Sequence, residues 1–135
     1  GGDGGSDGSR AASRPWLFPH LKVRVVDKRL RGGKLYLKKG RTLDVHPGAL
    51  ADVAMDESGE VLQLRQSALE TVVPKAPGAA LIIVAGKLRG SKARLLQAHT
   101  SEGAAAVQLV SDFTVHRLLL DDICEFTGVL DEHDE

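Results

Sequence analysis

The sequence predicts an all-β fold made of two small units, each with five short strands. Apolar and polar residues alternate with a period of two over short runs, as in strands with one buried face. Turn residues interrupt these runs at roughly 8–12-residue intervals, a spacing typical of small β-barrels. The same order of strands and turns then occurs a second time along the chain.

Charged residues alternate in blocks, although the formal net charge of the 135 residues is zero. Residues 22–41 hold nine basic side chains and one acid, and residues 42–74 hold six acids and one arginine. Residues 75–99 hold five basic side chains and no acid, and residues 100–135 hold nine acids and one arginine. Because unspecialised surfaces mix the two signs, the blocks indicate two copies of one module, each with a basic first half.

The composition limits the class of protein. Aromatic residues make up 4% of the chain and hydrophobic residues 42%, so the core is expected to be aliphatic. No apolar run approaches the roughly 18 residues that a membrane-spanning helix needs, and the start does not resemble a signal peptide. Cys124 is the only cysteine, so no intrachain disulfide can form, which fits a reducing compartment.

The first unit is expected over residues 14–74, after a flexible linker of Gly, Ser and Asp at residues 1–13. Its opening segment places Trp16 and Phe18 beside two prolines. One interpretation is a hydrophobic strap that closes one end of the unit. The other is a surface that stacks on a base or binds a partner protein.

The strands of the first unit follow from the alternation and the turn residues. We expect strands over residues 21–27, 35–45, 50–55, 61–65 and 69–73, and a single helical turn over 66–68. The second of these strands is interrupted at Lys38-Lys39-Gly40, and Gly40 is assigned as a structural turn residue.

The second unit, over residues 75–129, repeats this order. Strands are expected over residues 81–84, 93–98, 104–110, 113–119 and 123–126, with a two-residue turn at Ser111-Asp112. Units of about 55 residues lie near the lower size limit for an independent core, so we expect the two to pack on each other. Residues 130–135 are expected to form an acidic, disordered tail.

A glycine-bracketed basic loop connects the first two strands of the second unit. Gly86 and Gly90 flank it as structural turn residues, since glycine tolerates positive φ, and the loop is expected to direct its charge to solvent. The basic block of the first unit is denser, which favours that unit as the stronger binder. The candidate RNA-binding residues are Lys22, Arg24, Lys34, Lys38, Lys39 and Arg41 in the first unit and Lys87, Arg89, Lys92 and Arg94 in the second.

No catalytic or metal-binding pattern is evident in the sequence. The five histidines lie far apart, and a single cysteine cannot build a zinc finger. Phosphate-binding loops and nucleophile elbows do not occur. We therefore expect a protein that is not an enzyme and uses no metal or cofactor. With five aromatic residues available for stacking, RNA binding through the backbone with low sequence specificity is the consistent outcome.

The loop with Gly86 and Gly90 resembles a KOW motif, and several further blocks resemble the C-terminal half of the G-patch and KOW-motif proteins. The resemblance covers residues 16–135, but Ala93 stands where the motif usually has a third glycine. The blocks are KVRVVDK at 22–28, GGKLYLKKG at 32–40, MDESGEVLQ at 55–63, LETVVPK at 69–75, VAGKLRG at 84–90 and DDICEFTG at 121–128.

This resemblance implies two SH3-like five-stranded barrels, or tandem KOW domains, in a nuclear, spliceosome-associated protein that binds single-stranded or structured RNA. We expect a monomer. The G-patch of such proteins, which engages a DEAH-box RNA helicase, does not occur in these residues. The alternative is a protein-interaction module that docks a spliceosomal or helicase partner. A more distant similarity is to the KOW tandem that ends certain zinc-finger DNA/RNA-binding proteins.

Overall fold

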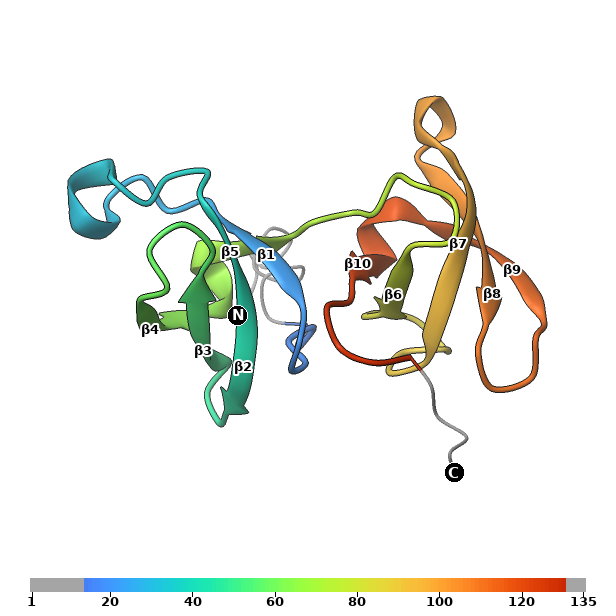
Figure 1. Cartoon of the computed structure of the whole chain (residues 1–135), viewed down its shortest axis with the longest axis horizontal. Coiled ribbons are helices and arrows are strands. Elements are labelled where there is room, and N and C mark those ends of the chain that lie inside the picture. The colour runs from blue at the N-terminus through green and yellow to red at the C-terminus, as the bar shows by residue number, and fades with distance from the viewer. Residues whose placement is uncertain (1–13, 131–135) are drawn as a thin grey trace, which may run out of the picture.

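The computed structural model describes residues 14–130, which form two units that lie side by side (Figure 1). Each unit is built on one antiparallel sheet. The predicted all-β class with five strands in each unit is confirmed. The linker expected at residues 1–13 and residues 131–135 of the expected tail lie outside the described residues. The strands are β1 (Lys22–Val25), β2 (Lys39–His46), β3 (Leu50–Met55), β4 (Val61–Arg65) and β5 (Leu69–Thr71), then β6 (Ala80–Ile83), β7 (Lys92–His99), β8 (Ala104–Leu109), β9 (Val115–Leu119) and β10 (Ile123–Glu125).

The two sheets have the same topology, which agrees with a repeated module. Their strand orders are β4-β3-β2-β1-β5 and β10-β6-β7-β8-β9, so the first strand of each unit lies between its second and fifth strands. The long second strands, β2 and β7, each have eight residues and each contain a register shift. The shift lies between Thr42 and Val45 in β2 and between Leu95 and Gln97 in β7.

Four short 3₁₀ turns are the helical elements within residues 14–130: η1 (Leu30–Gly33), η2 (Gln66–Ala68), η3 (Thr100–Glu102) and η4 (Leu120–Asp122). The turn η2 matches the helical turn predicted there. The expected strand start at residue 35 is wrong, because residues 34–37 form turns and β2 begins only at Lys39. The connection from β1 to β2 therefore spans residues 26–38 and carries η1 at its far end (Figure 1).

Each unit encloses an aliphatic core, as the composition predicts. In the first unit the inward residues include Val23, Val25 and Val53, each at most 1% exposed. In the second unit they include Ile83 and Val107, both fully buried. These positions alternate with outward residues along each strand, so the period-two pattern in the sequence identifies the inner face correctly.

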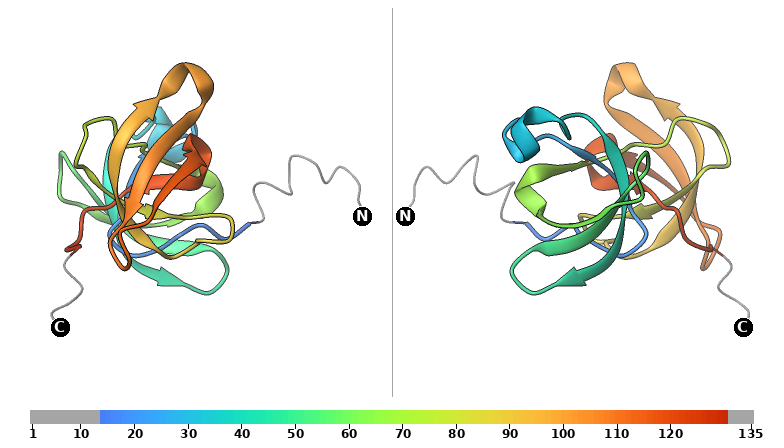
Figure 2. Two further views of the ribbon diagram at one scale, coloured as in Figure 1. Left: turned by 90° about the vertical axis from the view of Figure 1, so that its right-hand side faces the viewer. Right: turned by 60° about the vertical axis from the view of Figure 1, so that its left-hand side comes forward.

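The two units pack on each other and share a hydrophobic cluster, as expected from their small size. Leu21 and Phe126 form an antiparallel bridge between the units, where the segment before β1 meets the segment after β10 (Figure 2). The N–H of Glu125 also donates to the Val72 carbonyl at 2.7 Å. The outward-facing Cys124 is buried at this contact. Leu130, assigned to the tail from the sequence, is buried in the same cluster, so the packed chain extends at least to this residue.

Candidate nucleic-acid interface

Four of the predicted RNA-binding residues share the outer face of the first two strands. Lys22 lies opposite Arg41, and Arg24 lies opposite Lys39, in the β1–β2 ladder. Directly paired residues of antiparallel strands project on the same side of the sheet. The intervening residues of β1 are buried, so these four side chains point away from the core. We call Lys22, Arg24, Lys39 and Arg41 the basic face.

Gly40 and Thr42 hold β2 close to its neighbours beneath the basic face. Gly40 lies inside β2, so its assignment to a turn is wrong. Glycine is needed at this place because a Cβ would approach the Ala54 carbonyl oxygen to 2.7 Å. Thr42 is fully buried; its Oγ1 accepts the N–H of Leu21 at 2.8 Å and donates to the Phe18 carbonyl at 2.6 Å. These contacts fix the backbone that carries the four cations.

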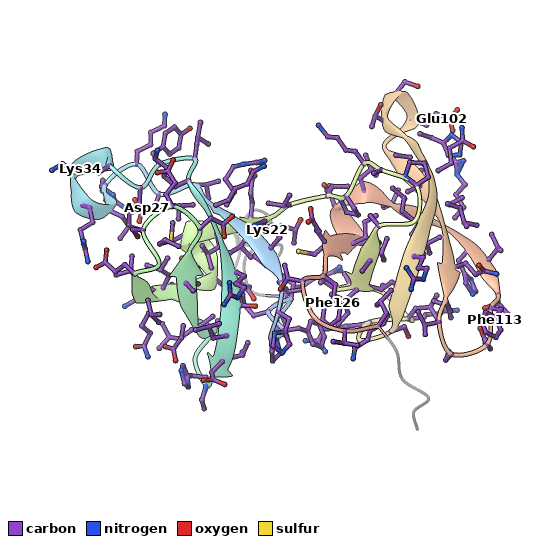
Figure 3. The ribbon with its side chains drawn as sticks, in the orientation of Figure 1. Lys22, Asp27, Lys34, Glu102, Phe113 and Phe126 are labelled. Atoms are coloured by element: carbon purple, nitrogen blue, oxygen red, sulfur yellow. The ribbon has the colours of Figure 1, made fainter. Side chains whose placement is uncertain are left out.

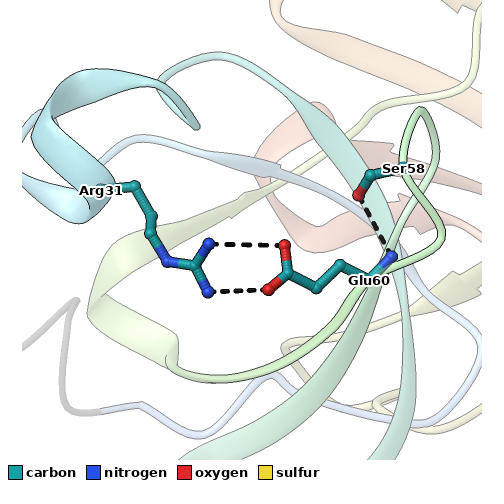
Figure 4. Close-up of polar contacts among 3 residues, drawn as sticks. All are labelled: Arg31, Ser58 and Glu60. Carbon is teal, nitrogen blue, oxygen red and sulfur yellow. Dashed lines mark hydrogen bonds and ion pairs between the residues drawn. The ribbon is translucent and has the colours of Figure 1, made fainter.

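Acids of the block at residues 42–74 neutralise part of the basic block at residues 22–41. Figure 4 shows one such pair, in which the two terminal nitrogens of Arg31 face the two carboxylate oxygens of Glu60. The charge alternation in the sequence is therefore partly an internal pairing across strands. Exposed ion pairs contribute only about 0–1 kcal/mol each, so a phosphate can replace a carboxylate at small cost. The pairs are Lys22–Asp56, Arg24–Glu70 at 2.7 Å, Lys38–Glu57 at 3.0 Å and Arg31–Glu60 at 2.8 Å.

Three of the predicted cations of the first unit have no ion-pair partner among residues 14–130: Lys34, Lys39 and Arg41. All three are exposed. Lys34 follows η1 at one end of the molecule (Figure 3), whereas Lys39 and Arg41 belong to the basic face. Two unpaired cations therefore lie beside two paired ones on the basic face.

A groove of about 570 Å³ continues the basic face toward the second unit. Arg24, Lys39 and Lys75 line it, and Lys75 belongs to the segment that joins the two units. The site residues predicted from the sequence omit Lys75, although it opens the basic block at residues 75–99. Acids also line this groove, so its charge is mixed; they are Glu70, Asp121 and Glu125.

The glycine-bracketed loop of the second unit turns back onto the first unit. Gly86 and Gly90 have φ values of +90° and +93°, the positive range that the sequence predicted for these turn residues. The Nε–H of Arg89 donates to the Pro15 carbonyl at 3.0 Å, and its guanidinium lies 4.6 Å from the centroid of the Phe18 ring. The loop was expected to direct its charge to solvent, and Lys87 and Arg89 are indeed exposed, but Arg89 also contacts the segment that holds Pro15 and Phe18.

The remaining candidate cations of the second unit differ in availability. Lys92 is half-buried and lies 5.1 Å from the centroid of the Phe126 ring. Arg94 is exposed and donates to the Gly78 carbonyl at 3.3 Å. Lys87 is exposed and has no polar partner in the part of the chain that the structure describes. The second unit therefore presents fewer unengaged cations than the first.

The segment around Trp16 connects the two units. The backbone N–H of Trp16 donates to Oε1 of Gln66 at 2.9 Å. Nε2 of the buried Gln66 donates to the Arg14 carbonyl at 2.7 Å. Leu17 is buried in the shared cluster, and Phe18 packs against it. These contacts favour the strap interpretation of the segment. Trp16 also lines a second groove between the units, of about 880 Å³.

Among residues 14–130, two titratable groups have pKa values clearly shifted from the ordinary ones. Burial raises the pKa of the Cys124 thiol to about 12. Hydrogen bonds from the backbone N–H and the hydroxyl of Thr114 lower the pKa of Asp112, so this exposed carboxylate stays ionised. Among the described residues no group of three or more His, Cys, Asp or Glu side chains is placed to hold a metal ion. The described helices are also all too short to cross a membrane.

Comparison with known proteins shows a relationship over most of the chain. The family model described as GPKOW C-terminal domain matches residues 21–128. The chain is 34% identical over 131 residues to Protein MOS2 of Arabidopsis thaliana, covering 96% of this chain and 28% of that protein. It is 36% identical over 131 residues to the human G-patch domain and KOW motifs-containing protein, covering 96% of this chain and 27% of that protein.

The KIN17 proteins form a second group of relatives. The DNA/RNA-binding protein KIN17 of Mus musculus is 39% identical over 85 residues, which cover 63% of this chain and 21% of that protein. The chain thus spans between about a fifth and three tenths of the length of these relatives. Since the match to the family model runs from the start of β1 through the end of β10, the chain belongs to the GPKOW C-terminal domain family.

Proposed function

We propose that this chain is an RNA-binding module of a nuclear RNA-processing factor, and that it contacts the RNA backbone through the basic face. The observation that carries the proposal is the register of β1 and β2, which gathers Lys22, Arg24, Lys39 and Arg41 on one outward surface. The name of the mouse relative, DNA/RNA-binding protein KIN17, supports the same class of function. Nuclear location and association with spliceosomal proteins belong to the proposal as well.

Phosphate contacts determine how the binding responds to salt. If the basic face and Lys34 together neutralise about five phosphates of a single strand, the logarithm of the affinity falls with the logarithm of the salt concentration at a slope near −0.7 per contact. This slope corresponds to about a hundredfold loss of affinity between ~50 and ~200 mM salt. Arg24 and Lys22 must exchange their carboxylate partners for phosphates to take part.

Low sequence specificity follows from the placement of the aromatic residues. Single-stranded RNA is read mainly through bases that stack on exposed aromatic rings. Phe18 is covered by Arg89, and the Phe126 ring is 7% exposed in the contact between the units. Tyr36 is 36% exposed but lies beside Lys28 near η1. The basic face itself therefore offers charge without a stacking platform.

Fluorescence anisotropy with a short labelled single-stranded RNA tests this proposal. We expect binding at ~50 mM salt that weakens about a hundredfold at ~200 mM salt. The double reversal Lys39→Glu and Arg41→Glu is expected to abolish it. Its matched control is the reversal of Arg65 and Arg117, two exposed cations away from the basic face that are not among the candidate RNA-binding residues. Salt-insensitive binding, or an equal loss in the two variants, would contradict the proposal.

The acids beside the basic face provide a second test, in which substitution is expected to strengthen RNA binding. Asp56 and Glu70 each pair with one of its four cations, so they halve its net charge. Replacing both by the neutral Asn and Gln should strengthen RNA binding at low salt. Unchanged or weaker binding would mean that these cations do not contact phosphate.

Docking of a spliceosomal protein, or of a DEAH-box helicase, is the second candidate function. The groove of about 880 Å³ between the units favours it, because Trp16, Leu69 and Val84 give the groove an apolar floor and both units contribute to its walls. A Trp16→Ala variant that keeps RNA binding but loses retention of a purified partner would support docking there.

A further inference from the structure

The turn between β3 and β4 in the first unit has the same backbone conformation as the turn between β8 and β9 in the second. The two turns carry different residues at the left-handed position. Gly59 has φ +75° and Phe113 has φ +62°. The N–H of Gly59 donates to the Met55 carbonyl at 2.8 Å, and the N–H of Phe113 donates to the Leu109 carbonyl at 3.0 Å. A bulky residue is rare at positive φ, and glycine adopts it without strain. The first unit therefore shows that this turn needs no phenylalanine.

Packing does not explain Phe113 either. Its side chain is 71% exposed and belongs to neither hydrophobic cluster of the described chain. The turn beneath it is held rigidly, since Asp112 accepts the N–H of Thr114 at 3.0 Å and Nε2 of Gln108 donates to the Phe113 carbonyl at 3.0 Å. An aromatic ring is thus held out to solvent at the cost of backbone strain, a combination that points to a binding role.

Exposed apolar residues continue from this ring along β9. Val115 and Leu119 are each 59% exposed. Val61 of the first unit matches Val115, because they pair with Ala54 and Gln108 at equivalent places in the two ladders. The position of Leu119 is instead occupied by Arg65 in the first unit. The second unit alone therefore has exposed apolar residues toward both ends of its outer strand, with Arg117 between them on the same face.

The backbone of β9 also offers an open sheet edge. This strand pairs only with β8 in the sheet. The bonds from the Leu109 N–H to the Thr114 carbonyl and from the Leu120 N–H to the Gly103 carbonyl show that even-numbered residues face β8. Because the direction alternates along a strand, the N–H and C=O groups of residues 115, 117 and 119 point to the open side. An unpaired edge of this kind is a template for another strand.

The charges around this edge indicate what kind of strand fits. Asp112 lies at one end of β9, and Asp121 and Asp122 follow its other end, where they also line the grooves between the units; none has an ion-pair partner within residues 14–130. Arg117, in the middle, pairs with Glu102 at 2.7 Å. A strand with an apolar centre and basic ends therefore complements the edge. RNA does not, because its phosphates would meet these carboxylates.

A second copy of this chain also fits poorly. An antiparallel pair of β9 edges centred on Arg117 would place the two arginines opposite each other, and like charges directly opposite destabilise a sheet. The same pairing would bring the Asp112 end of one copy toward the Asp121 end of the other. Arg117 and the flanking acids thus act against self-association.

We propose that Phe113 and the open edge of β9 form a docking site for an extended segment of another protein, with apolar residues in its centre and basic residues at its ends. The segment adds a strand to the second sheet, and Phe113 anchors one end of it. This site lies at the opposite end of the molecule from Lys34 (Figure 3). It is separate from the proposed RNA-binding face, so the two functions can be tested independently.

The test uses a fluorescein-labelled peptide, KKVTVTVKK, and the 135-residue chain. We expect anisotropy to report binding that becomes about tenfold weaker in Phe113→Gly and in Leu119→Arg, as for the loss of one anchor. Both variants should fold, because the first unit carries glycine and arginine at these two positions. The control Val61→Thr changes an exposed valine on β4 and should bind as the parent does. RNA binding by Phe113→Gly should be unchanged.

Two control peptides make the outcome decisive. EEVTVTVEE should not bind, and a version of KKVTVTVKK with N-methylated valines should bind weakly because it cannot pair along the edge. Equal binding of either control, or of KKVTVTVKK to Phe113→Gly, would overturn the proposal, as would no binding of KKVTVTVKK to the parent chain. Sedimentation that shows a dimer lost in Phe113→Gly would assign the edge to a second copy. RNA binding lost in Phe113→Gly would assign the hairpin to RNA.

Discussion

Arg89 of the second unit binds the strap of the first through two contacts of different kinds. Its Nε–H donates to the Pro15 carbonyl at 3.0 Å, and its guanidinium covers the Phe18 ring at 4.6 Å from the centroid. Gly90 lies beside the same ring, where a Cβ would make an ordinary contact at 3.9 Å, and its φ of +93° is the feature that favours glycine there. The basic loop therefore helps to fix how the two units are joined.

Replacing Arg89 by Ala should lower the stability of the whole chain. An exposed cation–π contact contributes about 0.5–1 kcal/mol, and a hydrogen bond contributes about 1 kcal/mol. We expect the free energy of unfolding in urea to fall by about 1–2 kcal/mol. Lys87→Ala, in the same loop but without a polar partner in the described chain, should change it by less than about 0.5 kcal/mol. Equal effects of the two substitutions would show that the Arg89 contacts are not stabilising.

Gly40 and Ala93 occupy equivalent places in β2 and β7, opposite Met55 and Leu109 respectively. Gly40→Ala should destabilise the chain by about 1–3 kcal/mol, because the new methyl group meets a backbone oxygen that cannot move freely. Ala93→Gly restores the motif glycine, yet it should also destabilise, by about 1 kcal/mol, since it removes a fully buried methyl group. Urea unfolding measures both. A gain in stability from Ala93→Gly would show that the second strand needs the glycine after all.

The strands were predictable where alternation and turn residues agree. For β3, β4 and η2 the sequence predicts the observed ends to the residue, because buried and exposed positions alternate there and glycine or proline marks the turns. The two largest errors in the strand starts fall where a residue other than glycine adopts positive φ. Leu37 and Phe113 do so at φ +66° and +62°. The sequence pattern assigns both to strands, but each strand starts two residues after them, at Lys39 and at Val115.

The candidate site was predictable only in part. Alternation alone places Lys22 and Arg24 on one face, and the strand order then adds Lys39 and Arg41. Which acid neutralises which cation depends on cross-strand neighbours, so the pairing of Arg24 with Glu70 has no local signal in the sequence. The contact of Arg89 with Pro15 and Phe18 depends on how the two units pack, which a repeat pattern does not determine.

The stored strain at Phe113 predicts a substitution that stabilises the fold. Phe113→Gly should raise the free energy of unfolding by about 1 kcal/mol, because the left-handed conformation costs a non-glycine residue about 1–2 kcal/mol. Gly59→Phe, at the same place in the first unit, should lower it by a similar amount. Thermal and urea unfolding of the two variants provide the measurement. If Phe113→Gly destabilises the chain instead, the ring has a structural role and its exposure needs another explanation.

Cys124 provides a probe of the contact between the units. It is fully buried, and its Sγ donates to the Lys22 carbonyl at 3.1 Å across that contact. The thiolate is the reactive form of cysteine, and burial raises the pKa of this thiol to about 12. Labelling by a disulfide reagent near pH 8 should therefore be very slow and should accelerate with urea in parallel with unfolding. Arg89→Ala should also accelerate it, because that substitution loosens the joint.

The same thiol predicts how stability depends on alkaline pH. In the unfolded chain its pKa is near the ordinary value of 9.0, whereas in the folded chain it is about 12, so the folded state holds the proton more tightly. Below about pH 9 the thiol is protonated in both states and adds no pH dependence. As the pH rises from 9 toward 12, the unfolded state loses the proton first and the free energy of unfolding falls. Urea unfolding at pH 8 and at pH 10.5 should show a smaller loss of stability in Cys124→Ala than in the parent chain. Equal losses in the two proteins would mean that the thiol does not stay buried and protonated in the folded state.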